Sequence, residues 1–319
     1  MARSIRPRYL DTRKNRKTMK VKCLQTTGQG WFDEVEYDKP DPAPYEIEVR
    51  AVMTGVCRSD IDMMSGNFGP LPLHMQGHEG IGQVTRLGSN IVTTKIGSYV
   101  ATRGEPAYAD YYNVKMDEYV EIPEANPKYI LEPVACGINL INQAKTYFQD
   151  RQGRNENNRV LIIGSGFLAW VAYYTMRLNG YIFHIDVLGS NNKDLWDGIL
   201  KSSTTESYDI VIDLTGKYRL GIDINLNNNA VIIDGVGKTV DREESQQQLW
   251  KAITTVRPSP RNSRFIDCMH MAKYWIENGY LEVDSFWTQC YNRDTEWQQA
   301  FADGVDRPSG YSRGYIKWD

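Results

Sequence analysis

The chain has 319 residues, of which 41% are hydrophobic and 24% are charged. These values are typical of a soluble globular protein, and the length suits two domains of about 100 to 200 residues each. With 37 basic and 40 acidic residues the net charge is -3, so no general attraction to nucleic acid is expected. No apolar run reaches the roughly 20 residues that a membrane-spanning helix requires.

The five cysteines lack the regular spacing of a disulfide framework or a zinc ribbon. This favours a reducing, cytoplasmic setting. The first twenty residues are strongly basic and contain no apolar segment like that of a secretory signal. A transit peptide or a phosphate-binding arm is an alternative, but we interpret residues 1–18 as a flexible basic tail.

The region after this tail predicts a β-rich domain. Apolar side chains alternate in short segments that Gly, Pro or Asn interrupt, which is typical of strands. The expected strands are residues 21–25, 47–52, 82–87, 99–102 and 109–114. So many short strands close most simply into a small β-barrel.

The pattern changes after Glu132 and Pro133, where helices and strands begin to alternate. The expected helices are residues 134–148 and 170–179, and the expected strands are residues 159–163, 182–188, 208–214 and 230–234. This alternation indicates parallel strands with crossover helices. The chain is then expected to end with a helix at 265–277, a strand near 286, a helix at 296–302 and a strand at 314–317.

The 159–163 strand leads into a turn of the form G-x-G-x-x-A, made by Gly164, Gly166 and Ala169. Strand, glycine turn and helix in this order predict a dinucleotide-binding unit. The glycines let a pyrophosphate approach the backbone, where the helix N-terminus offers free N–H groups.

The choice of dinucleotide depends on the next strand. Asp186 lies twenty-two residues after Gly164, near the position of an acid that would hold the ribose of NAD. The apolar pattern continues past Asp186, however, so we expect this strand to end at small polar residues that include Ser190 and Asn191. These residues, followed by Lys193, would accommodate and neutralise a 2′-phosphate. We therefore favour NADP, with NAD as the alternative.

Two short motifs carry the donors of a catalytic zinc site. Cys57-Arg58-Ser59-Asp60 is followed by Gly77-His78-Glu79-Gly80, then by Gly82, Gly88 and Ile91. A thiol, an imidazole and an acid beside glycines are what such a site needs, although a lone histidine in a glycine-rich turn is often incidental. The longer spacing resembles the zinc signature of the medium-chain dehydrogenase/reductase family.

This resemblance implies an α/β protein with a GroES-like β-barrel catalytic domain and a Rossmann cofactor-binding domain. The catalytic domain is expected at residues 19–141 and 262–319, and the Rossmann domain at 142–261. Family members without the four-cysteine structural zinc lobe hold one zinc, and residues 100–106 of this chain cross that region without a cysteine. We therefore predict a single catalytic zinc.

The resemblance also implies roles for individual residues. Cys57 and His78 correspond to the first two zinc ligands, and Glu132 matches the third, with Cys136 as its rival. Glu79 matches a substitute ligand, and Asp60 matches the carboxylate that orients the imidazole. The proton relay would begin at Ser59 and end at Asp62, which replaces a histidine, while Arg313 would reach the pyrophosphate.

The function implied is that of a zinc-dependent NAD(P)-linked alcohol or polyol dehydrogenase. Its substrate would be a small alcohol or carbonyl compound, and homodimers or homotetramers are usual among relatives. Phe68, Leu73 and Met75 either line the substrate pocket or belong to the core. The alternatives are a metal-free NADPH-dependent enone or quinone reductase of the same fold, and a non-catalytic binder that uses the basic tail.

Overall fold

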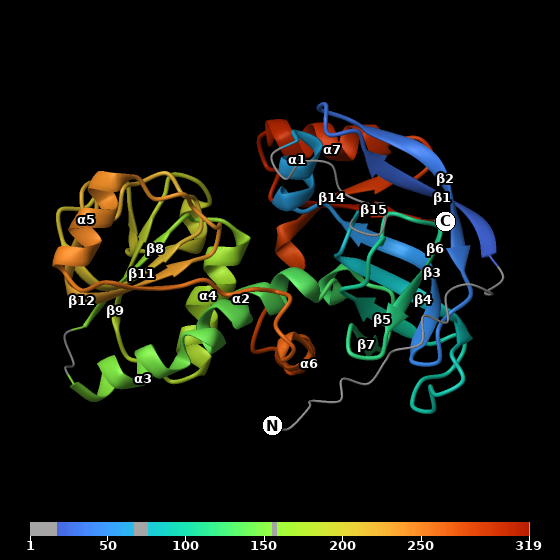
Figure 1. Cartoon of the computed structure of the whole chain (residues 1–319), viewed down its shortest axis with the longest axis horizontal. Coiled ribbons are helices and arrows are strands. Elements are labelled where there is room, and N and C mark those ends of the chain that lie inside the picture. Colours follow the sequence, from blue (N-terminus) through green and yellow to red (C-terminus); the bar gives the residue numbers. More distant parts are fainter. Residues whose placement is uncertain (1–17, 67–75, 155–157, 319) are drawn as a thin grey trace, which may run out of the picture.

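The computed structural model describes residues 18–66, 76–154 and 158–318. Two lobes lie side by side, with α2, α4 and α6 where they meet (Figure 1). Thr18, the last residue of the expected tail, is the first residue of β1, whereas residues 1–17 lie outside the described part. Phe68, Leu73 and Met75 lie outside it as well.

The first lobe is built on antiparallel strands. One sheet has the order β14-β15-β3-β4-β5-β7, with β6 paired to β3, and β1 pairs with β2 in a separate hairpin. The strands are β1 (Thr18–Thr26), β2 (Phe32–Pro40), β3 (Glu46–Gly55), β4 (Gly80–Leu87), β5 (Tyr99–Thr102), β6 (Tyr111–Lys115), β7 (Tyr119–Ile122), β14 (Trp287–Asn292) and β15 (Arg313–Lys317). Since β14 and β15 come from the end of the chain, the chain leaves this sheet and returns to it.

The second lobe contains one parallel sheet of order β10-β9-β8-β11-β12-β13. In chain order this is 3-2-1-4-5-6, the Rossmann arrangement, whose switch point lies between β8 and β11. The strands are β8 (Arg159–Ile163), β9 (His184–Leu188), β10 (Leu200–Lys201), β11 (Ser207–Asp213), β12 (Asn225–Asp234) and β13 (Thr254–Val256). Strand β8 is fully apolar after its first residue because the sheet buries it on both faces.

The crossovers of this sheet are short. Within residues 158–256, all of which the structure describes, α-helices occur only after β8 and after β12. These are α4 (Phe167–Leu178) and α5 (Arg242–Trp250), while the β9 to β10 connection holds one 3₁₀ turn, η4 (Lys193–Leu195). The expectation of crossover helices is therefore met at only two connections.

The predicted continuous helix at 134–148 is wrong. Two helices, α2 (Glu132–Gln143) and α3 (Lys145–Arg154), meet at Ala144, whose backbone has φ -100° and ψ 8°. The break turns the chain so that the buried ring of Phe148 stacks on that of Tyr181, at 5.1 Å between centroids. Helix α2 packs on α4 and on α6 (Phe265–Glu277), and one hydrophobic cluster continues through both lobes.

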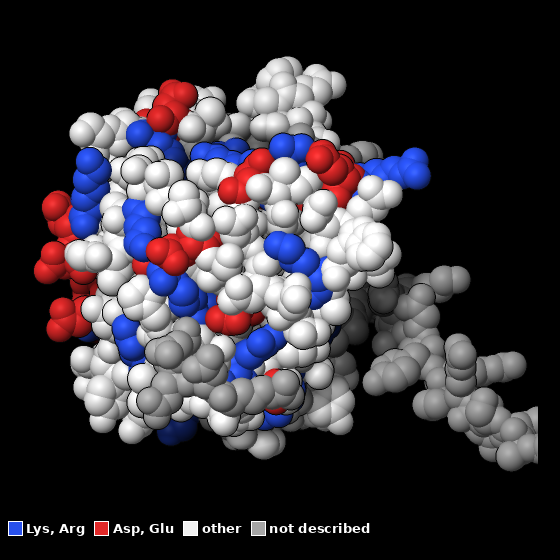
Figure 2. Space-filling view, turned by 90° about the vertical axis from the view of Figure 1, so that its left-hand side faces the viewer, with Lys and Arg blue, Asp and Glu red and all other residues white. Residues whose placement is uncertain are grey.

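The remaining helices are short. They are α1 (Arg58–Met64), α7 (Trp297–Asp306) and the 3₁₀ turns η3 (Pro127–Tyr129) and η5 (Asp284–Phe286). None of the helices in the described ranges is long and apolar enough to cross a membrane. On the outer face of the second lobe, basic and acidic side chains are interspersed (Figure 2).

Candidate metal and cofactor site

Cys57 lies between the end of β3 and the first turn of α1. Its backbone N–H donates to Oδ2 of Asp60, 2.8 Å away, so the acid of the first helical turn fixes the residue before the helix. This contact brings Cys57, Ser59 and Asp60 to one end of a helix of only seven residues.

A glycine turn brings His78 to the same place. Gly77 has φ +70°, and a Cβ there would stand 2.7 Å from the ring and the backbone nitrogen of Tyr108. No other residue type fits without displacing that tyrosine. The hydroxyl of Tyr108 in turn lies 2.7 Å from Oδ2 of Asp60, so the two ligand motifs are connected through one buried tyrosine.

Asp60 stands behind the imidazole of His78. The carboxylate is 1% exposed, and its Oδ1 lies 3.7 Å from Nδ1 of His78. The opposite nitrogen, Nε2, lies 3.4 Å from Oγ of Ser59. Burial lowers the pKa of His78, but the charge of Asp60, a hydrogen bond with Cys57 and the charge of Glu132 together outweigh this effect, and the net shift is upward. Asp60 thus lies on the Nδ1 side of the ring, and its role as the carboxylate behind a metal ligand stays a prediction.

This histidine is one of three possible metal ligands that lie close together. Cys57, His78 and Glu79 each offer one ligand atom, and these atoms lie within 4.8 Å of one another. No other group of three metal-type donors this close occurs in the part of the chain that the structure describes. Glu79 is fully buried, and its Oε1 has no hydrogen-bond partner among the described residues. An orphaned carboxylate oxygen beside a thiol and an imidazole fits a divalent cation.

The electrostatics of the group lead to the same inference. Burial, followed by the charge of Glu79, raises the pKa of the Cys57 thiol. Burial also raises the pKa of Asp60, although His78 opposes the shift. Acidic groups thus gather in a buried space faced by one histidine and one arginine, and a zinc ion would supply the missing positive charge.

Glu132, the predicted third ligand, stands next to this close group rather than in it. It is the first residue of α2, and Cys136, one turn later, donates its thiol proton to Oε1 of Glu132 at 3.3 Å. Burial raises the pKa of Glu132 to about 7, with His78 opposing the shift. Burial likewise raises the pKa of Cys136. Glu132 as third ligand and Cys136 as its rival stay predictions.

Two further predicted residues have partners of their own. Asp62 pairs with Arg58 on the surface of α1, with 3.3 Å between Oδ1 and Nε. Arg313 donates from Nη2 to Oε2 of Glu79. This contact joins residues 234 positions apart. Neither Tyr108 nor the Arg313 to Glu79 contact has a local sequence signal, so sequence reasoning missed both.

The glycine turn lies at the switch point of the parallel sheet. Gly164 has φ +115° at the end of β8, and Gly166 is the N-cap of α4 without a side-chain cap. No described atom lies within 4 Å of the place where a Cβ of Gly166 would stand, whereas Ala169 is buried in the core. This open cradle before uncapped N–H groups fits the pyrophosphate of a dinucleotide.

The loop after β9 folds back onto this turn. The N–H of Asn191 donates to Oγ of Ser165 at 3.2 Å, and Ser190 is exposed beside it. Asp186, in contrast, lies in the middle of β9, is 2% exposed and has charged neighbours. Its carboxylate accepts from Arg159 at 3.0 Å and from Tyr208 at 2.9 Å.

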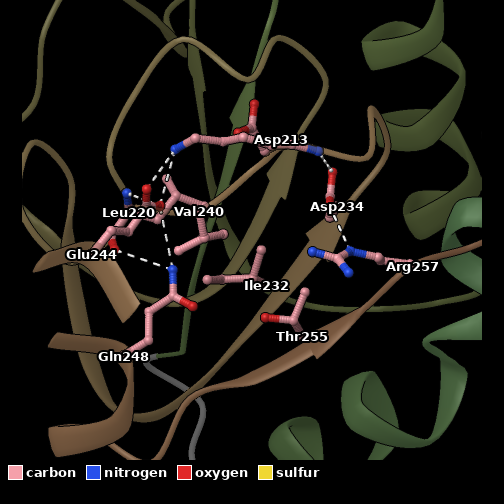
Figure 3. Close-up of a pocket in the computed structure, with 10 residues that line it drawn as sticks. Asp213, Leu220, Ile232, Asp234, Val240, Glu244, Gln248, Thr255 and Arg257 are labelled. Carbon is pink, nitrogen blue, oxygen red and sulfur yellow. Dashed lines mark hydrogen bonds and ion pairs between the residues drawn. The ribbon is translucent and has the colours of Figure 1, made fainter. Parts of the chain in front are cut away.

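A small hollow lies beside the carboxyl ends of β11, β12 and β13 (Figure 3). Asp213 and Asp234 end two of these strands and accept hydrogen bonds from the backbone of the loops that follow them. Lys238 pairs with Glu244 at 2.9 Å and Arg257 with Asp234 at 3.0 Å. The carboxylates of the hollow therefore hold its cations and order the loops at the edge of the sheet where Rossmann folds bind a dinucleotide.

Known proteins resemble both lobes. Residues 43–125 match the model of the alcohol dehydrogenase GroES-like domain. A 5-exo-hydroxycamphor dehydrogenase of Pseudomonas putida is 45% identical over 58 residues, 18% of this chain and 16% of that protein. An NADP-dependent alcohol dehydrogenase C of Mycobacterium bovis is 24% identical over 233 residues, 61% of this chain and 65% of that protein. The chain thus spans less than two thirds of the length of these relatives.

The structure of a thermostable alcohol dehydrogenase from Pyrobaculum aerophilum has the same fold. It superposes with a TM-score of 0.72 at 15% identity, over 94% of this chain and all of that chain. The matches and the sheet topology together define a two-domain protein that pairs a GroES-like domain with a Rossmann domain. The GroES-like match and the shared fold agree with the fold class predicted from the motifs, and they point to the medium-chain dehydrogenase/reductase family.

Proposed function

We propose that this chain is a zinc-dependent, NADP-linked alcohol dehydrogenase that interconverts an alcohol or polyol with its aldehyde or ketone. The observation that carries the proposal is the close donor group of Cys57, His78 and the buried Glu79, with Asp60 behind the histidine. The Mycobacterium bovis relative is named as an NADP-dependent alcohol dehydrogenase, which supports both the activity and the cofactor.

In this proposal Cys57 and His78 hold the zinc together with Glu132 or Glu79. Zinc at this site would polarise the alcohol oxygen, and the nicotinamide would accept the hydride. Asp60 would keep the proton of His78 on Nδ1, which leaves Nε2 unprotonated and free to bind the metal. The 3.4 Å between Oγ of Ser59 and Nε2 of His78 puts the serine hydroxyl next to the metal position, where it would take the proton of the alcohol.

Asp62 is proposed as the exit of this proton. It follows Ser59 by three residues on α1, so both side chains lie on one face of that helix. The carboxylate is 31% exposed and pairs with Arg58. A partly exposed carboxylate on the serine's own face can pass a proton from the partly buried hydroxyl to solvent.

The preference for NADP rests on the surroundings of Asp186. Its carboxylate is buried and accepts from Arg159, Tyr208 and Lys201, so it offers nothing to a ribose hydroxyl. The loop residues Ser190 and Asn191, by contrast, are exposed beside Lys193. Replacing Lys193 with Glu should weaken NADPH binding by about tenfold and leave NADH binding nearly unchanged. Equal losses for both cofactors would argue against a 2′-phosphate at this loop.

The activity is tested with a panel of primary alcohols, secondary alcohols and polyols, following absorbance of the reduced cofactor. His78→Asn should lose both zinc and turnover, because the imidazole is one of the three donors of the close group. His270→Asn, which changes an exposed histidine on α6, is the matched control and should keep both. A fully active protein without zinc would contradict the proposal and favour the metal-free reductase. We still expect a homodimer or homotetramer in the cytoplasm. Light scattering, which gives the molar mass in solution, tests the oligomeric state.

A further inference from the structure

The chain returns from the second lobe to the first through residues 257–264, which we call the strap. Figure 1 shows it in orange, running from the second lobe to α6. Most strap residues are exposed, whereas α6 packs on α2 and on β7 of the first lobe. The other crossing between the lobes is α2, which packs on α4 of the second lobe. The strap and α2 therefore run along the same seam.

Two side chains of α2 hold the strap at Ser259. The carbonyl of Ser259 accepts from Nδ2 of Asn139 and from Nε2 of Gln143, both at 3.1 Å. Gln143 also donates to Oδ1 of Asn139 at 2.9 Å, so the two amides act as one unit. This contact fixes the strap along the helix that joins the lobes.

The next two strap residues bind the loop that follows β5. The carbonyl of Pro260 accepts from Nη1 of Arg103 at 2.8 Å. In return, Nη2 of Arg261 donates to Oε1 of Glu105 at 2.6 Å. The side chains of Arg103 and Glu105 are only 14% and 13% exposed, so water competes little with either bond. We call this reciprocal pair of contacts the clamp, because each segment contributes one arginine and one acceptor.

Arg103 is itself held in place by its surroundings. Its backbone N–H donates to the carbonyl of Glu118 at 2.8 Å, and its Nη2 donates to Oε1 of the same residue at 3.0 Å. Its Cζ lies 5.4 Å from the ring centroid of the buried Phe265, the first residue of α6. The carbonyl of Pro260 therefore reaches this guanidinium only while the strap lies against the loop.

The other end of the strap is fixed to the second lobe. Arg257 donates from Nε to Oδ2 of Asp234 at 3.0 Å. Asp234 ends β12, and its Oδ1 accepts from the backbone N–H groups of three residues in the following loop. A chain of four residues, the separation of Arg257 from Arg261, spans at most about 14 Å. A large movement between the lobes must therefore break the clamp or the pair with Asp234.

The position of the lobes matters because the expected dinucleotide turn faces the first lobe. Phe167 follows Gly166 directly, and its ring lies 5.0 Å from that of Phe286, which belongs to the segment leading into β14. In the proposed reaction, a nicotinamide held by the second lobe must reach the metal donors of the first. Both lobes are thus needed to bind the whole cofactor.

We propose that Arg103 and Arg261 are positioning residues whose clamp holds the two lobes in the arrangement that binds NADP(H), an inference that rests on the proposed function. Without the clamp, the free protein occupies many arrangements of the lobes, and only a fraction of them is competent to bind. The apparent dissociation constant then rises by the inverse of that fraction. A ligand that contacts the second lobe alone is not affected.

The test measures the affinities of NADPH and of adenosine 2′,5′-bisphosphate by isothermal titration calorimetry. In the proposed function, the bisphosphate carries only groups that bind to the second lobe. Arg261→Gln removes one contact of the clamp and should weaken NADPH binding by about threefold. Arg103→Gln combined with Arg261→Gln removes both contacts and should weaken it by about tenfold or more, whereas the affinity for the bisphosphate should change less than about twofold.

Arg264→Gln is the matched control. Arg264 belongs to the same strap, but it is 83% exposed and pairs only with Asp267 of the adjoining helix, so both affinities should stay at the wild-type values. Glu105→Arg combined with Arg261→Glu reverses the ion pair and should restore NADPH binding that Arg261→Gln weakens. Small-angle X-ray scattering of the cofactor-free proteins gives a second measurement, in which the double glutamine variant should show a larger radius of gyration than the wild type.

The outcomes separate this inference from the proposed function. If the wild type binds NADPH and the double glutamine variant binds it equally well, the positioning role is refuted and the dehydrogenase proposal stands. Equal weakening of NADPH and of the bisphosphate also refutes it, because the damage then lies within the second lobe. If the wild type binds no NADPH, the proposed function falls, and an unchanged radius of gyration would refute the clamp as well.

Discussion

Replacing Asp60 with Asn should weaken zinc binding without changing the shape of the side chain. In the structure Oδ2 lies 2.8 Å from the N–H of Cys57 and 2.7 Å from the hydroxyl of Tyr108. The amide oxygen of asparagine can keep both contacts only if it takes the position of Oδ2. Its NH₂ group must then occupy the position of Oδ1, which lies 3.7 Å from Nδ1 of His78.

An N–H donor in that position changes the preferred form of the histidine. Nδ1 would have to accept a hydrogen bond, so the ring proton would move to Nε2, the nitrogen that should bind zinc. Loss of such a partner behind a metal ligand typically costs 10- to 100-fold in affinity, or about 1.4 to 2.7 kcal/mol. We expect Asp60→Asn to fall in this range.

The assay is zinc competition against a chromophoric chelator at fixed pH. Asp62→Asn is the control, because it removes the same charge two residues further along α1, where the carboxylate is 31% exposed and pairs with Arg58. Its zinc affinity should change less than twofold, because exposed charges are screened. An Asp60→Asn protein that binds zinc as tightly as the wild type would refute this reasoning about the histidine.

Three further predictions concern stability, measured by denaturant unfolding. Gly77→Ala should lower the free energy of unfolding by clearly more than the roughly 1 to 2 kcal/mol of left-handed backbone strain, because its Cβ would also stand 2.7 Å from Tyr108. Gly97→Ala, at φ +92° in open space, should show the strain alone. Equal losses would contradict this. Metal-free Glu132→Gln should gain stability over the wild type as pH rises. Burial raises the folded pKa of Glu132 to about 7, above its ordinary value of 4.5, so the wild type loses stability between these values; a pH-independent difference would disprove this. Lys39→Met, which breaks a buried ion pair with side chains 2% and 5% exposed, should cost about 3 to 5 kcal/mol, whereas Lys20→Met, whose pair is 73% and 61% exposed, should cost less than about 1 kcal/mol; similar losses would count against the burial argument.

Elements with a clear pattern of buried apolar residues could be predicted from the sequence. Strand β8 and helix α6 occupy the predicted residues, because the first is apolar throughout and the second has a buried stripe at helical spacing. Helix α5 was not predicted, since a single residue of it, Glu244, is buried and no apolar stripe marks it. Helix α1 was missed because seven residues are too few for a periodic signal.

The candidate site divides in the same way. Cys57, His78 and Glu79 could be predicted because short motifs place their donors beside glycines, and Gly77 must be glycine to pass Tyr108. The Arg313 to Glu79 contact depends on β15 returning to pair with β3, which no local pattern specifies. The surroundings of Asp186 likewise depend on residues from three other strands, β8, β10 and β11, although the apolar pattern correctly placed it inside a strand.

The most direct test of the metal site is the zinc content of purified protein, by elemental analysis of the wild type and two cysteine variants. The wild type should contain one zinc per chain, and Cys57→Ser should contain none. Cys290→Ser, which changes an exposed cysteine on β14, should keep one. Two zinc ions per chain, or one zinc retained in Cys57→Ser, would contradict the account.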